Sequence, residues 1–264
     1  MEQKTTTIEG KIISYKTAGD GKAVVLLHGF GADSSIWEEQ MAHLKNQYLV
    51  IAPDLPGIGG SELTSDQSME GIAEIIKAII ENEEVEKVAL IGHSMGGYAT
   101  LAFAEKYPEW LTGFGLFHST SIADNDEKKA AREKGIEFTR SHGAASFLET
   151  TAPKMFAKSS KENNQPLYNR FMDELPEMTK EAVIDYYEAM MKRPDRTAIL
   201  KNAKVPVLFV YGAQDEIIDL DKTIEQASLP AVATVEILKQ SGHLGMIEEP
   251  AATNRIIEDF LSDL

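Results

Sequence analysis

The residues with the clearest chemical meaning surround Ser94, in the segment Val88-Ala-Leu-Ile-Gly-His-Ser-Met-Gly-Gly97. An apolar run of strand length enters this segment, and Gly92 and Gly96 frame the serine. The pattern indicates a strand that enters a helix through a turn so tight that side chains at the two glycine positions would collide with neighbouring backbone. The hydroxyl would then lie beside the first free amides of the helix. We therefore predict that Ser94 is a nucleophile.

A serine hydroxyl is a weak nucleophile unless a base takes its proton and an acid orients that base. Asp215 follows a predicted strand over 205–211, and His243 follows another over 233–238. Loops after parallel strands lie at one edge of a sheet, so both side chains are expected beside the serine. The chain order Ser, Asp, His predicts a triad with His243 as the base and Asp215 as its orienting acid.

Attack on a carbonyl also requires two backbone N–H groups that receive the developing oxyanion. One candidate is the N–H of Met95, at the start of the predicted helix. The other is the N–H of Phe30, in the glycine-rich segment His28-Gly-Phe-Gly31 that follows an apolar run over 23–27. The sequence therefore predicts an oxyanion site built from backbone atoms.

Two further residues are candidates for the lining of a substrate pocket. Trp37 lies just past the Phe30 loop, with core packing as its alternative role, and His118 ends a predicted strand, with structural hydrogen bonding as its alternative role. Histidines and carboxylates show no metal-ligand spacing, and the chain has no cysteine. We accordingly predict no metal site.

Strand-like and helix-like segments alternate along the first half of the chain and again at its end. Continuous apolar runs of strand length are typical of strands that are buried on both faces, as in a parallel sheet with right-handed crossovers. Ile8 to Thr17, with Glu9-Gly10 inside, is typical of an antiparallel hairpin. The predicted strands are 23–27, 48–52, 87–91, 111–117, 205–211 and 233–238, and the predicted helices are 36–46, 68–81, 98–107, 220–228 and 251–261.

Between Ile122 and Lys204 the buried strand runs disappear, and segments rich in charged, aromatic and methionine residues replace them. Prolines lie between these segments or at their ends, as helix boundaries require. The predicted helices are 125–142, 144–157, 162–174 and 179–191. We predict an α/β fold with a mostly parallel, doubly wound sheet, whose core comprises 1–121 and 205–264 and whose helical cap comprises 122–204.

Composition limits the classes of partner. At 264 residues and 43% hydrophobic content, the chain is long and apolar enough for one large globular domain with an insertion. A formal charge of −16 disfavours nucleic acid and anionic membranes as partners, and its simplest role is to keep the protein in solution. The expected partner, a small-molecule substrate, follows from the predicted triad. We recognise no signal peptide and no membrane-spanning run, so a cytoplasmic location is expected. The oligomeric state is left open.

These motifs together resemble those of the α/β-hydrolase fold family, in its lid-bearing serine esterase branch, over almost the whole chain. The resemblance implies esterase or thioesterase chemistry without a cofactor, with Ser94 as nucleophile and His243 and Asp215 as its partners. It also assigns the oxyanion donors to Phe30 and Met95. The matching segments are His28-Gly-Phe-Gly31, Pro53-Asp-Leu-Pro-Gly57 with Ser61, Gly92-His-Ser-Met-Gly-Gly97, Gly212-Ala-Gln-Asp215 and Gly242-His243.

One position departs from the family pattern, because Ile58 stands where a histidine usually follows Asp-Leu-Pro-Gly. That position lies outside the triad. The predicted reaction is the hydrolysis of a small carboxylic ester or thioester through an acyl-enzyme. The alternatives are that the same triad hydrolyses a carbon–carbon bond or performs perhydrolysis, or that the fold serves as a small-molecule receptor without turnover.

Overall fold

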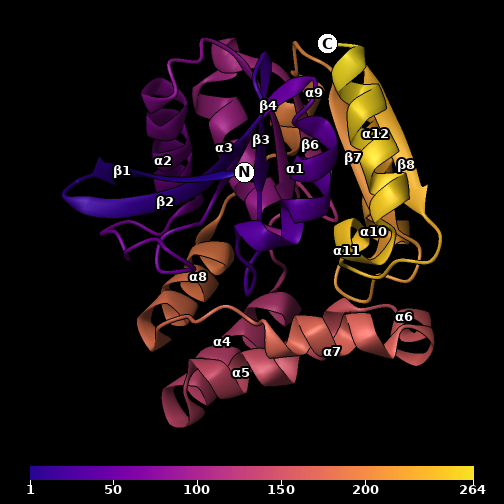
Figure 1. Cartoon of the computed structure of the whole chain (residues 1–264). Helices are drawn as coiled ribbons and strands as arrows, with labels where there is room; N and C mark the ends of the chain where they lie inside the picture. The colour runs from indigo at the N-terminus through magenta and orange to yellow at the C-terminus, as the bar shows by residue number, and fades with distance from the viewer.

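One eight-stranded sheet forms the centre of the computed structural model, which describes residues 1–264 (Figure 1). Its strand order is β1-β2-β4-β3-β5-β6-β7-β8, in which β2 is antiparallel to both neighbours and every other pair is parallel. The predicted mostly parallel, doubly wound sheet is therefore confirmed. The strands are β1 (Glu2–Ile8), β2 (Lys11–Ala18), β3 (Lys22–Leu27), β4 (Tyr48–Pro53), β5 (Val88–His93), β6 (Leu111–Phe117), β7 (Val207–Gly212) and β8 (Ala233–Leu238).

Helices cover both faces of this sheet, and a further group of helices forms a separate layer at one end of it. The α-helices are α1 (Glu38–Leu44), α2 (Met69–Asn82), α3 (Met95–Lys106), α4 (Asp126–His142), α5 (Ala144–Thr151), α6 (Lys158–Asn163), α7 (Gln165–Asp173), α8 (Lys180–Lys192), α9 (Thr197–Lys201), α10 (Leu220–Thr223), α11 (Gly245–Glu248) and α12 (Pro250–Ser262). Short 3₁₀ helices span Ser34–Trp37, Pro108–Trp110, Ala152–Met155 and Ile224–Ser228.

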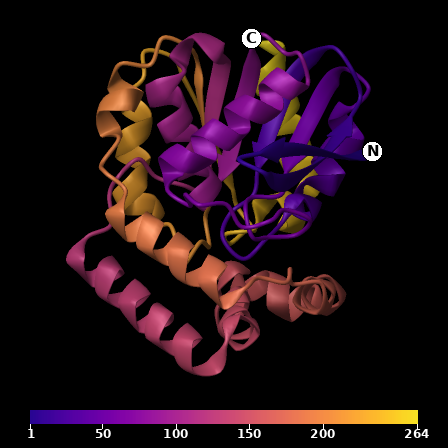
Figure 2. The ribbon, with the colours of Figure 1, turned by 90° about the vertical axis from the view of Figure 1, so that its left-hand side faces the viewer.

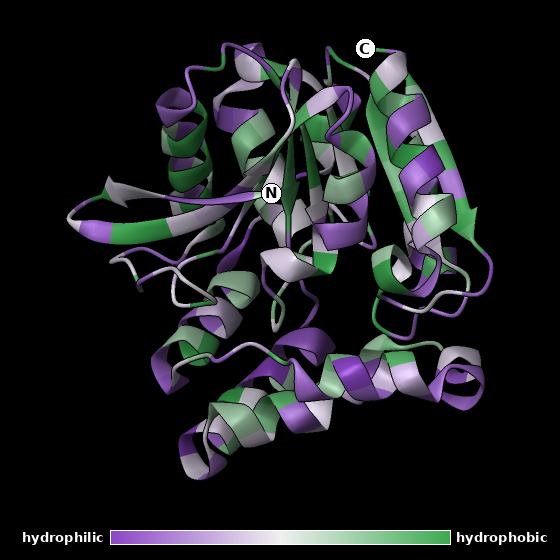
Figure 3. Ribbon diagram, in the orientation of Figure 1, coloured by the Kyte–Doolittle hydropathy of each residue, from purple (hydrophilic) through white to green (hydrophobic).

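Strand β3 illustrates how the sheet divides the core into two parts. Successive side chains of a strand point to opposite faces. Val25 and Leu27 accordingly pack into a cluster with residues of α2 and α3, whereas Val24 and Leu26 pack into another with residues of α1 and α12. Both faces are apolar, and the hydropathy colouring shows the central strands as mainly green (Figure 3). The sheet is thus a rigid, doubly covered scaffold for the loops at its ends.

The helices α4 to α9 lie between β6 and β7 in the chain, where the cap is predicted. In two perpendicular views α4 to α7 lie beyond one end of the sheet, and α8 leads back toward it (Figures 1 and 2). Side chains anchor this layer to the core, since the hydroxyl of Tyr186 in α8 donates to the carbonyl of Pro56 at 2.7 Å. No helix of the molecule is both long and apolar enough to cross a lipid bilayer.

The predicted single helix over 162–174 is wrong, because the chain forms α6 and α7 with a break at Asn164. The backbone of Asn164 is non-helical, and its side chain accepts the N–H of Leu167 as an N-cap. Pro166 lies in the first turn of α7, where its missing N–H costs nothing. The break therefore follows from an Asn-x-Pro start signal inside a region of helical composition.

Candidate active site

Ser94 occupies a strained turn between β5 and α3, with φ 51° and ψ −115°. A non-glycine residue in this region costs about 1–3 kcal/mol and persists only where its surroundings impose it. The N–H of Ser94 donates to the carbonyl of Phe117 at 2.9 Å. A Cβ atom on Gly92 would come within 2.2 Å of the carbonyl oxygen of Gly96. The glycines thus allow the close strand–helix approach that holds the serine at the end of the sheet.

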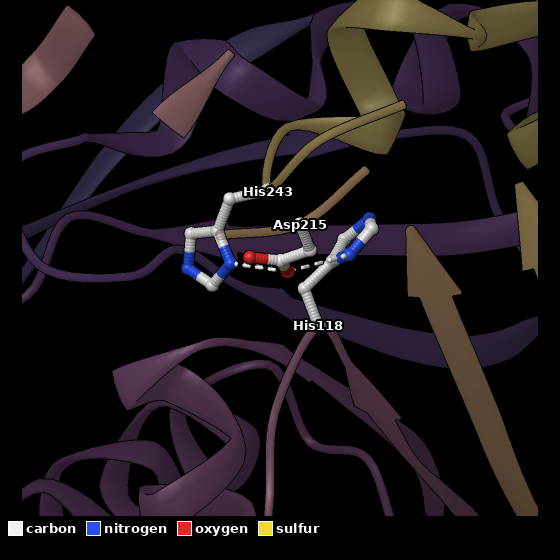
Figure 4. A group of neighbouring side chains, drawn as sticks. All are labelled: His118, Asp215 and His243. Carbon is white, nitrogen blue, oxygen red and sulfur yellow. Dashed lines mark hydrogen bonds and ion pairs between the residues drawn. The ribbon is translucent and has the colours of Figure 1, made fainter. Parts of the chain in front are cut away.

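Asp215 and His243 meet although they are 28 residues apart in the chain (Figure 4). The Nδ1 atom of His243 lies 2.8 Å from Oδ2 of Asp215. The imidazole therefore donates its Nδ1–H to the carboxylate, which leaves Nε2 as the basic nitrogen of the neutral ring. Nε2 makes no hydrogen bond and is not a buried atom.

The carboxylate of Asp215 is held from both of its oxygens. Oδ1 accepts the N–H groups of Ile217 at 2.8 Å and Ile218 at 2.9 Å. Oδ2 faces Nδ1 of His243 and, at 3.3 Å, Nδ1 of His118. Burial alone would raise the pKa of Asp215, but the two imidazoles outweigh it and hold that pKa well below its usual range. The group is an ionised, immobile acceptor.

His118 is not a pocket residue, in contrast to the sequence-based prediction. Its side chain is fully buried, and its Nε2 accepts the N–H of Gly245 at 3.2 Å. Nδ1 must therefore carry the proton, and Nδ1 lies 3.3 Å from Oδ2 of Asp215 (Figure 4). Burial lowers the pKa of His118, so the ring is neutral at neutral pH. His118 therefore lies next to the carboxylate of Asp215 and does not line the cavity that holds Ser94.

Trp37 is not a pocket residue either. Its side chain is fully buried, and its ring packs edge-on against Phe117 with the ring centroids 5.4 Å apart. It belongs to the core cluster on the α1 and α12 face of the sheet. The alternative role, core packing, is the correct one.

Ser94 and His243 line one cavity of about 110 Å³ between the sheet and the cap. No hydrogen bond joins Oγ of Ser94 to Nε2 of His243 in this structure, and such contacts are often long before substrate binds. Phe30 also lines the cavity, and its N–H donates to no protein atom. The remaining lining residues are Gly31, Tyr98, Arg132, Leu148, Thr151, Ala152, Met155, Tyr187, Met190 and Ile217.

Met95 is the first residue of α3. The first N–H groups of a helix lack a carbonyl partner within the helix. Its amide therefore has no partner within the helix, and its role as the second oxyanion donor stays a prediction.

His118, Asp215 and His243 together offer three donor atoms within 4.8 Å of one another, a grouping that sequence spacing did not reveal. Such a grouping can in principle hold a metal ion. Here, however, both Nδ1 atoms carry their hydrogen and face the same carboxylate oxygen, at 3.3 Å for His118 and 2.8 Å for His243. A protonated ring nitrogen has no lone pair for a cation, so the hydrogen-bond pattern fits an acid–base pair rather than a metal centre.

Two further residues contribute to the site. His93, which sequence reasoning places next to the triad as a supporting or loop residue, is fully buried, and its Nε2 lies 2.8 Å from the backbone carbonyl oxygen of His243. Sequence reasoning missed the other residue. Arg132 of α4 lines the cavity. A charged residue within a charged helical segment looks like part of a solvent-exposed face, so the sequence carried no signal for Arg132.

Comparisons with known proteins identify relatives that match almost the whole chain. A thermophilic esterase from Thermogutta terrifontis, in a malate-bound structure, superposes with a TM-score of 0.92 at 27% identity and covers 100% of this chain and 99% of its own. A 2-hydroxy-6-oxononadienedioate/2-hydroxy-6-oxononatrienedioate hydrolase from Comamonas testosteroni is 25% identical over 275 residues, 95% of this chain and 91% of that protein. The 3-oxoadipate enol-lactonase 2 of Acinetobacter baylyi is 24% identical over 260 residues, 96% of this chain and 94% of that protein.

A protein-family model described as alpha/beta hydrolase fold matches residues 22–250. The match covers β3 through β8 together with the helices between them. The chain therefore belongs to the α/β-hydrolase fold family and is an enzyme of the hydrolase class.

Proposed function

We propose that the protein is a serine hydrolase that cleaves a short carboxylic ester or thioester through an acyl-enzyme. The observation that carries this proposal is the buried, ionised Asp215 bonded to Nδ1 of His243, with the free Nε2 of that imidazole in the same cavity as Ser94. An imidazole held in this tautomer is the base that a serine nucleophile needs.

In the first step Oγ of Ser94 attacks the carbonyl carbon, and Nε2 of His243 takes the hydroxyl proton. Asp215 stays ionised and stabilises the imidazolium that forms. The negative charge on the carbonyl oxygen is received by the N–H groups of Phe30 and Met95. The imidazolium then protonates the leaving alcohol or thiol as the tetrahedral intermediate collapses to the acyl-enzyme.

The second half of the reaction repeats these roles with water. Nε2 of His243 takes a proton from the water that attacks the acyl carbon, and then returns it to Oγ of Ser94. The free acid leaves, and the serine is restored. No step requires a group beyond the protein and water.

Carbon–carbon bond hydrolysis is the second candidate. The observation in its favour is the relative from Comamonas testosteroni, which is named as a hydrolase of a 2-hydroxy-6-oxo dienedioate. The same serine and base would serve that reaction. Turnover of such a dienoate at a rate above that of matched esters would favour it over the ester reaction.

The decisive experiment compares the wild type with Ser94→Ala on p-nitrophenyl esters of increasing acyl length and with a fluorophosphonate probe. We expect kcat to fall by at least about 1,000-fold and covalent labelling to vanish. The matched control is Ser141→Ala, which removes an exposed hydroxyl on α4 and should change neither readout.

Unlabelled wild-type protein would contradict the proposal. Turnover near zero together with stabilisation by a ligand would instead favour a receptor, and perhydrolysis would appear as halogenation or epoxidation activity that depends on peroxide.

A further inference from the structure

The cavity that holds Ser94 is mostly apolar, yet a guanidinium lies in its wall. Eight of its 13 lining residues are hydrophobic. Arg132 of α4 is the permanently charged residue among them, and its side chain is 17% exposed. A charge that is largely removed from water is costly unless a partner compensates it. The partners of Arg132 therefore decide what this wall of the cavity can bind.

A single carboxylate is shared between two guanidinium groups at this position. Oδ2 of Asp124 accepts Nε–H of Arg132 at 2.6 Å, and its Oδ1 lies 2.9 Å from Nη1 of Arg193. The remaining contacts of Arg193 are neutral, with the carbonyls of Met190 and Ile122 and with the ring of Tyr98 3.8 Å from its guanidinium carbon. The cluster of Asp124, Arg132 and Arg193 thus carries one positive charge in excess.

The excess charge lies on the side that faces the cavity. Arg193 is enclosed, with a side chain that is 3% exposed, whereas Nη1 and Nη2 of Arg132 make no hydrogen bond and are not buried. The bond from Nε to Asp124 and the ring of Tyr187, whose centroid is 5.2 Å from the guanidinium carbon, hold the group in place. Its end therefore presents a fixed pair of donors, a geometry that matches a carboxylate in a bidentate manner.

We propose that Arg132 is a specificity-determining residue that binds a free carboxylate on the substrate. The inference rests on the proposed function and names its substrate class: short half-esters of dicarboxylic acids, or lactones that bear a carboxylate. A cavity of about 110 Å³ is well below the size of pockets for drug-sized ligands, so the chain between the two carboxyl groups is short. The molecule as a whole carries a charge of −16 and repels anions, which makes a local cation necessary for such a substrate.

The test compares kcat/KM for monomethyl glutarate with kcat/KM for methyl pentanoate, a neutral ester of similar chain length, by titration of the released acid. For the wild type we expect the anionic ester to be preferred by about 10- to 100-fold, as for a hydrogen-bonded pair of charges. In Arg132→Met this preference should disappear or invert, mainly through KM, while turnover of methyl pentanoate persists. Arg132→Lys keeps the positive charge but loses the pair of Nη donors, and it should retain part of the preference for the anionic ester.

Arg140→Met is the matched control, because Arg140 lies exposed on the same helix. It should leave the ratio of the two esters unchanged. Equal kcat/KM for the two esters in an active wild type would overturn the role of Arg132 and leave the serine hydrolase intact. Absence of turnover of either ester, together with an unreactive Ser94 toward fluorophosphonate, would instead overturn the proposed function itself.

Discussion

Asp215 is faced by more N–H groups than its role beside one histidine requires. Besides His243, it is faced by two backbone amides and by the buried Nδ1–H of His118. Because His118 is neutral, its Nδ1–H faces the carboxylate at 3.3 Å without adding a charge that would compete with the imidazolium. We interpret His118 as a positioning residue. It holds the carboxylate of Asp215 in place, and this carboxylate in turn orients the imidazole of His243.

Replacing His118 with alanine should lower kcat by about 10-fold with KM changed by less than about twofold, because the close polar contact of its Nδ1–H with the charged acid is lost. His118→Asn is the paired variant, since asparagine tolerates the φ of 47° at this position and keeps an N–H donor. It should recover part of kcat. Steady-state kinetics and the rate of fluorophosphonate labelling check both values. Equal kcat in the alanine variant and the wild type would mean that the contact has no catalytic consequence.

From the sequence alone we could predict that Ser94, Asp215 and His243 lie at one edge of the sheet. Each follows a strand, and the carboxyl ends of parallel strands lie at the same edge. The sequence did not show whether the side chains of His118 and Trp37 line the substrate pocket. Both also lie beside strand ends or loops of that edge, but their side chains point into the packed interior. A residue's position along a strand end specifies the edge, whereas tertiary packing decides whether its side chain faces substrate.

At the scale of elements, Glu248 of α11 links the cap to the His243 loop. Its Oε2 accepts the N–H of Ala157 at 2.9 Å, and its Oε1 accepts those of Gly242 at 2.8 Å and Leu244 at 3.3 Å. Burial raises the pKa of Glu248 although these hydrogen bonds oppose the shift. The carbonyl of Met155 adds a second link, because it accepts the N–H of His243 at 2.7 Å.

Glu248→Ala should therefore lower the free energy of unfolding by about 3 kcal/mol or more, since buried N–H groups lose their acceptor. Labelling of Ser94 should also slow, because the loop that carries His243 loosens. Urea denaturation measures the first effect. Glu258→Ala, which removes a partly exposed carboxylate beside His43 and Gln47, should stay within about 1 kcal/mol of the wild type. Equal losses in the two variants would contradict this link.

The core elements were predictable because their apolar runs have a clear period, as in α2, where Ser68 caps a helix whose buried face repeats at helical spacing. The cap was less predictable. Its helices pack largely against one another and around the cavity, and their breaks depend on local capping at residues such as Asn164. α11 was missed because four residues are too few for a periodic signal.

For the whole molecule, three of the six histidines are fully buried: His28, His93 and His118. Burial lowers the pKa of each below its ordinary value of 6.5. As the pH falls below 6.5, the unfolded chain therefore binds protons that the folded protein does not, and acid shifts the equilibrium toward unfolding. Each histidine contributes up to about 1.4 kcal/mol per pH unit in that window, down to its folded pKa.

Acidification also reduces the self-repulsion that a charge of −16 causes, since the chain approaches its isoelectric point near 4.8. The change of the free energy of unfolding with pH is thus the difference between two opposing effects. A variant is needed to isolate the contribution of the buried histidines. Between about pH 7.5 and about pH 5.5 we expect urea denaturation to show a smaller loss of stability in His93→Gln than in the wild type. Exposed His142→Gln should keep the wild-type slope. Only the pH dependence is compared, so the test holds even if His93→Gln is less stable than the wild type at every pH. Parallel curves of unfolding free energy against pH for all three proteins would refute the buried-histidine explanation.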